Sequence, residues 1–154
     1  MNAEDGTPVT VSSAKGQRLA LILFCGGLAS LFFFNILPGF GSEERGWTIW
    51  VEIIRFVQSP ELFRDTKDLI SIASLLSLLV LVTASPFLIP VYLKSRLAWW
   101  LATLMAGIIT SALWFILLFM VAPPRLGVGG WCLLAAPALN LAGLLALRFA
   151  KRPD

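Results

Sequence analysis

Four long apolar segments, separated by shorter polar stretches, dominate the pattern along the chain. They cover about residues 19–37, 69–93, 97–122 and 131–149, and none contains a charged residue away from its ends. At about 1.5 Å per residue, a helix of even the shortest segment is about 28 Å long, close to the hydrocarbon thickness of a bilayer. The pattern therefore predicts an all-α integral membrane protein, a four-transmembrane-helix bundle.

The first segment has an alternative interpretation, a cleavable signal peptide, because Lys15 and Arg18 precede it. Its apolar run is longer than the usual signal core, and residues 38–41 offer no small-residue cleavage site. We therefore expect the segment to be retained as the first span. Residues 1–18 are expected to form a flexible cytoplasmic tail, and residues 150–154 a second, short tail.

Residues 38–68 form the longest polar connection and are expected to be an external loop. Large apolar residues recur at helical spacing over residues 47–57, and Thr48, Glu52 and Arg55 fall on the opposite side. This pattern predicts a short amphipathic interfacial helix with its tryptophans at headgroup depth. The loop is either a solvated connection or a docking surface, and the docking hypothesis assigns partner binding to Trp47, Trp50, Glu52 and Arg55.

Prolines interrupt the second and fourth segments and end the third. Pro86 and Pro90 lie near the far end of the second segment, which they are expected to kink, because each removes a backbone donor and crowds the preceding turn. Pro123 and Pro124 end the third segment. Broken helices can build transporter sites, but isolated prolines are also common in ordinary membrane helices.

The positions of Lys and Arg predict the orientation of the spans. With the amino terminus inside, the inner segments hold Lys15, Arg18, Lys94, Arg96, Arg148, Lys151 and Arg152. The outer segments hold Arg45, Arg55, Arg64, Lys67 and Arg125. Because positive charge accumulates on the cytoplasmic side, we expect both termini in the cytoplasm, in a bacterial cytoplasmic (inner) membrane.

Composition narrows the classes of function. Of the 154 residues, 58% are hydrophobic and 14% are charged, and none is histidine. The net charge of +3 comes from tails and loops, so no nucleic-acid partner is expected. No catalytic motif, metal-ligand spacing or phosphate loop is present in the sequence. We therefore predict a protein that is not an enzyme and that holds no metal and no cofactor.

The spans lack an ionisable residue in mid-membrane, where a transporter or proton relay usually keeps one. This absence counts against a resemblance to the small multidrug-resistance transporters, four-span proteins that rely on a membrane-embedded glutamate. Carriers of uncharged solutes are not affected by this argument.

Two groups of polar residues lie inside the spans. Ser71, Ser74 and Ser77 share one face of the second helix, where they either help helices to approach or line a wet path. Asn140 lies in the middle of the fourth span, where an unpaired amide is costly. We expect it to bond a neighbouring helix, with contact to a ligand as the alternative.

These observations leave three hypotheses. The first is an accessory or structural subunit that binds a membrane-protein partner or a second copy of itself in the bilayer. The second is a small oligomeric channel or a carrier of an uncharged solute. The third is an immunity-type protein that blocks a pore-forming toxin.

Overall fold

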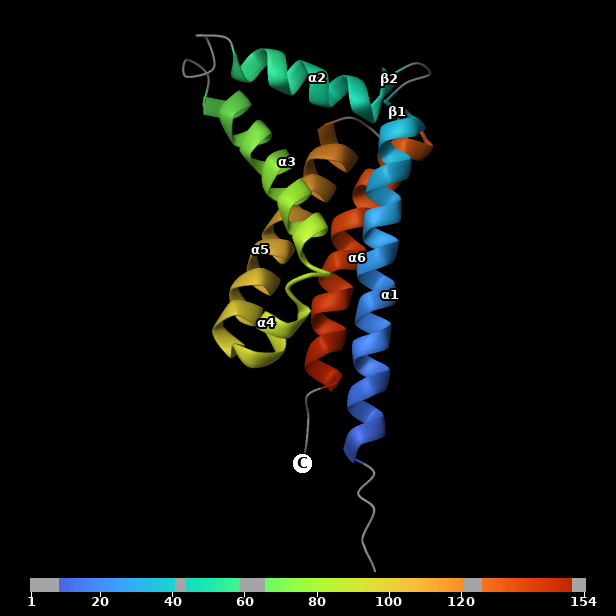
Figure 1. Cartoon of the computed structure of the whole chain (residues 1–154). Coiled ribbons are helices and arrows are strands. Elements are labelled where there is room, and N and C mark those ends of the chain that lie inside the picture. The colour runs from blue at the N-terminus through green and yellow to red at the C-terminus, as the bar shows by residue number, and fades with distance from the viewer. Residues whose placement is uncertain (1–8, 41–43, 59–65, 121–125, 151–154) are drawn as a thin grey trace, which may run out of the picture.

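The computed structural model describes residues 9–40, 44–58, 66–120 and 126–150. The chain is mainly helical, and its only strands in these ranges form a short antiparallel hairpin (Figure 1). The elements are α1 (Val9–Ile36), β1 (Pro38–Phe40), β2 (Glu44–Arg45), α2 (Gly46–Val57), α3 (Thr66–Ala84), α4 (Ile89–Lys94), α5 (Arg96–Phe115), the π-helical turn η1 (Ile116–Met120) and α6 (Val128–Ala150).

Within the described ranges, three helices are long and apolar enough to cross a membrane. Their candidate spans are Lys15–Ile36, Arg96–Phe119 and Val128–Arg148. They correspond to the first, third and fourth segments of the sequence, which confirms that these three segments are helices apolar enough to span a membrane. The first helix begins earlier than expected, since the tail predicted for residues 1–18 is helical from Val9 onward.

The second apolar segment is not one continuous helix. α3 ends at Ala84, residues 85–88 form a turn, and α4 begins at Ile89. Pro86 has no N–H to donate to the carbonyl of Val82, and the amides of Phe87 and Leu88 turn back to the carbonyl of Ala84. The kink predicted at Pro86 and Pro90 is a break of the helix at residues 85–88, and the described apolar part before it, Ile72–Ala84, is shorter than the three candidate spans. The fourth span over residues 69–93 stays a prediction.

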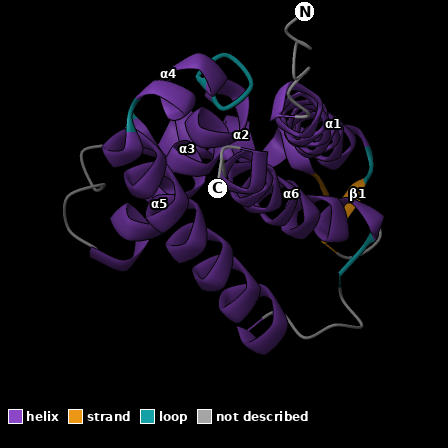
Figure 2. Cartoon of the chain, turned by 90° about the horizontal axis from the view of Figure 1, so that it is seen from below, coloured by secondary structure: helices purple, strands orange, loops and turns teal. Residues whose placement is uncertain are grey.

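The helices α1 and α6 form the most extensive pair in the structure and run antiparallel (Figures 1 and 2). Glycine permits their close approach. A Cβ added at Gly27 of α1 would lie 3.1 Å from the carbonyl oxygen of Ala136, and one at Gly143 of α6 would lie within 2.6 Å of the Phe24 ring. α5 packs on the other side of α6, so α6 occupies the middle of the bundle.

The hairpin closes one end of this pair. The amide of Gly127 donates to the carbonyl of Gly39 at 3.0 Å. Gly129 and Gly130 at the start of α6 lie against the backbone of residues 37–39. The chain reversal after α1 is thereby packed directly on the first turn of α6.

Two apolar clusters fill the bundle. The first gathers side chains of α1, α3, α5 and α6 toward the hairpin end, including Leu31, Phe34, Leu78, Val82 and Leu134. The second lies toward α4 and includes Ala20, Phe24, Tyr92, Trp99 and Leu144. Close packing within these clusters joins the long helices into one unit.

The helix α2 lies across the hairpin end of the bundle (Figure 1). Ile53 is buried, and Ile49 and Trp50 pack against the first cluster. The opposite side of α2 carries exposed residues, so the amphipathic helix predicted from the sequence is present as a helix, with its inner face on the bundle.

Because the backbones approach closely at Gly129, we predict that replacing this glycine with alanine lowers the stability of the protein more than the same change at an open position. Gly129→Ala would bring a Cβ to 2.7 Å from the carbonyl oxygen of Leu37, and we expect it to lower the free energy of unfolding by about 1–3 kcal/mol. The matched control is Gly107→Ala in α5, where no atom lies within 4 Å, so alanine should be neutral or stabilise by up to about 1 kcal/mol. Thermal unfolding in mild detergent, followed by circular dichroism, compares the two, and equal effects would contradict this packing.

Candidate functional site

The helix α2 is joined to α1 by a partly buried pair of polar side chains. The indole N–H of Trp50 donates to the side-chain oxygen of Asn35 at 2.6 Å. The amide nitrogen of Asn35 in turn donates to the carbonyl of Leu31 at 2.7 Å. At the start of α2, the hydroxyl of Thr48 donates to the carbonyl of Arg45 at 2.7 Å. These bonds hold α2 in a defined place on the bundle.

The residues predicted to bind a partner therefore divide into two groups. Trp50 is half-buried and bonded inside the chain, so its indole N–H is already used. Trp47, Glu52 and Arg55 are exposed. Trp47 is 52% exposed and joins Ile54 in an apolar strip, which lies beside the polar side chains of Glu52 and Arg55.

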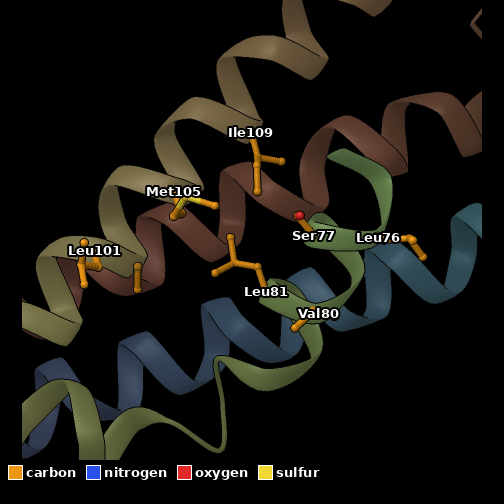
Figure 3. Close-up of a pocket in the computed structure, with 8 residues that line it drawn as sticks. Leu76, Ser77, Val80, Leu81, Leu101, Met105 and Ile109 are labelled. Atoms are coloured by element: carbon orange, nitrogen blue, oxygen red, sulfur yellow. The ribbon is translucent and has the colours of Figure 1, made fainter. Parts of the chain in front are cut away.

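The predicted serine face lies partly beside a groove. The side chain of Ser71 lies outside the described residues, and Ser74 is half-buried and makes an interaction of its own. Ser77 lines a groove between α3 and α5 with a volume of about 440 Å³ (Figure 3). The other residues lining it are apolar: Leu76, Val80, Leu81, Leu101, Ala102, Met105 and Ile109.

The groove is not a polar path through the bundle. Leu76, Val80, Leu101 and Met105 are exposed, so the groove opens on the side of the bundle. Threonine hydroxyls on these helices bond to carbonyls of their own helix, for example Thr110 to Ala106 at 2.6 Å. Among the described residues of the serine face, only Ser77 contributes a hydroxyl to the lining of this apolar groove.

Asn140 is fully buried, and neither atom of its amide group has a hydrogen-bond partner among the described residues. It lies one turn from Ala136 on the face of α6 that meets Gly27, where an added Cβ would be 3.8 Å from the backbone nitrogen of Asn140. Along α6 it separates the residues of the two apolar clusters. The predicted bond to a neighbouring helix is not formed with any residue that the structure describes, and a buried amide without a partner is costly.

A basic and aromatic cluster lies at the opposite end of the bundle from α2. The guanidinium of Arg148 lies 5.1 Å from the ring centre of Trp99 and 5.3 Å from that of Trp100. The indole N–H of Trp99 donates to the carbonyl of Leu144 at 2.7 Å, which joins α5 to α6 beside this contact. From the sequence, Arg148 was expected only to help set the orientation, although the Trp99–Trp100 pair close to Lys94 and Arg96 was a visible signal of this cluster.

The described side chains form no group of three or more His, Cys, Asp or Glu residues that could hold a metal ion. Comparisons with protein-family models, with curated proteins and with solved structures find no match to this chain.

Removing the indole N–H of Trp50 tests the anchor of α2. Trp50→Phe keeps most of the ring volume but removes the donor to the partly buried oxygen of Asn35, so we expect the free energy of unfolding to fall by about 0.5–1.5 kcal/mol. Trp47→Phe, on the exposed side of the same helix, should change it by less than about 0.5 kcal/mol. The readout is thermal unfolding in mild detergent, and a loss at Trp47 as large as at Trp50 would refute the assigned anchor.

The unpaired amide of Asn140 predicts a gain in stability on substitution. Asn140→Leu removes the buried polar group and should raise the free energy of unfolding by about 1–3 kcal/mol. The same change at Asn35 removes two hydrogen bonds and should destabilise the protein. Chemical unfolding of both variants measures the difference. A destabilised Asn140→Leu protein would show that this amide is satisfied in the native membrane protein.

Proposed function

We propose that the chain is a four-span membrane protein with both termini in the cytoplasm and α2 in the outer interface. The second crossing is made by α3 together with α4, which follow each other from the α2 end to the opposite end of the bundle (Figure 1). α1 begins and α6 ends at that same opposite end. The described basic side chains support this orientation: five belong to the end with the termini, Lys15, Arg18, Lys94, Arg96 and Arg148, against Arg45 and Arg55 at the other.

Within this topology, the proposed function is binding: the chain acts as an accessory or structural subunit of a larger membrane assembly. The observation that carries the proposal is the surface of α2. Its inner face is anchored by Trp50 and Asn35, and its outer side presents Trp47 and Ile54 beside Glu52 and Arg55. An apolar strip beside charged residues on a fixed helix is typical of a protein-binding surface.

Site-specific photo-cross-linking in native membranes tests this proposal. A benzophenone side chain placed at Trp47 or Glu52 should give a discrete protein adduct, because both positions are exposed on the outer side of α2. The matched control is Ile22 of α1, which is 67% exposed on the flank of the bundle and should give no such adduct. Lipid adducts alone at positions 47 and 52, with a monomer in native mass measurements, would overturn the proposal.

A second candidate function, a carrier or channel for an uncharged solute, has two supporting observations. The helix break at residues 85–88 and the unpaired amide of Asn140 are features that a solute site can use. Against it, the groove beside Ser77 is apolar. Flux of a neutral solute into reconstituted liposomes, abolished by Asn140→Leu, would favour this candidate over the accessory subunit. The immunity-type hypothesis has no specific observation behind it.

A further inference from the structure

The guanidinium of Arg148 is held in place by aromatic rings, and no acidic side chain that the structure describes lies beside it. It lies over two indole rings at 5.1 and 5.3 Å, and it is exposed. Stacking on an aromatic face leaves the N–H groups at the edge of a guanidinium free to donate to an anion. No acidic side chain among those the structure describes lies at this end of the bundle, since the only one, Glu52, belongs to α2 at the other end.

Arg96 extends the same site from the neighbouring helix. It lies three and four residues before Trp99 and Trp100, which places the three side chains on one face of α5. The two tryptophans stack edge to face, with ring centres 5.1 Å apart. Arg148 thus contacts the tryptophan pair from α6, and Arg96 lies one turn before the pair on the adjoining helix α5.

The depth of the two arginines indicates the source of the anion. Arg96 is the first residue of one candidate span, and Arg148 is the last residue of another. Both therefore lie at the same edge of the apolar layer, where the phosphate groups of lipids are found, and Trp99 and Trp100 lie about one turn further in, at the depth of an aromatic belt. Lys94, Lys15 and Arg18 add positive charge at this end.

From charge and depth together, we propose that Arg96, Trp100 and Arg148 form a binding site for an anionic phospholipid of the cytoplasmic leaflet. The two guanidiniums bind the phosphate of the headgroup, and Trp100, which is 46% exposed, packs against the glycerol region. The site is separate from the α2 surface proposed to bind a protein partner.

Native mass spectrometry of the full chain in detergent, titrated with phosphatidylglycerol or with phosphatidylcholine of the same acyl chains, tests the site. The unmodified protein should retain phosphatidylglycerol preferentially. The double variant Arg96→Gln/Arg148→Gln should bind it about tenfold more weakly, the change expected for loss of a charge-assisted hydrogen bond. The matched control, Arg45→Gln/Arg55→Gln, removes the same charge at the other end and should keep the preference.

The outcomes separate the site from its alternatives. Equal loss in both double variants, or no loss in Arg96→Gln/Arg148→Gln, would overturn the proposal. So would stronger binding of inorganic phosphate or of polyglutamate than of phosphatidylglycerol, because the anion would then be a free ion or an acidic protein segment. If circular dichroism shows that the double variant does not fold, the single variants Arg148→Lys and Trp100→Leu are tested in its place. Unchanged retention of phosphatidylglycerol in both would reject the site.

Discussion

The close contact of α1 with α6 is the constraint on which the other parts of the structure depend. In a bilayer, apolar helices gain little from hiding apolar surface from lipid, so close packing and hydrogen bonds must hold them together. Gly27 and Gly143 allow that packing, and Gly127 to Gly130 extend it to the hairpin. α5 then packs on the free side of α6, and α2 is anchored on α1 through Asn35.

The hairpin end and the opposite end of the bundle differ, because different groups are exposed at the two ends of the α1–α6 pair. At the hairpin end, α2 covers the first apolar cluster and presents a mixed apolar and charged side. At the other end, Trp99 bonds across to α6 and Arg148 stacks on the tryptophan pair. One end is thus suited to a protein surface and the other to the phosphates of a membrane leaflet.

Local patterns predicted much of the fold and only part of the candidate site. Apolar length and helical spacing were sufficient for the helices, three of which are long enough to span, and for the helix at 46–57. Whether Pro86 would bend or interrupt the second segment depends on tertiary packing after the turn, where Tyr92 is buried in one cluster with Trp99 and Leu144, and the local sequence does not contain that information. The sequence also did not predict the hydrogen bond from Trp50 to Asn35 or the contact of Arg148 with Trp99, because each joins residues that are far apart along the chain.

The central claim is that α3 and α4 together cross the membrane, because the four-span topology and both proposed binding ends depend on it. The most direct measurement is cysteine-accessibility labelling. Cys25 and Cys132 are replaced with alanine, and one cysteine is introduced either at Gln58, an exposed position before α3, or at Lys94, an exposed position at the end of α4. A membrane-impermeant thiol reagent added to intact cells should label position 58, and it should label position 94 only after permeabilisation. Labelling of both positions in intact cells would contradict the account, since α3 and α4 would then enter and leave on the same side.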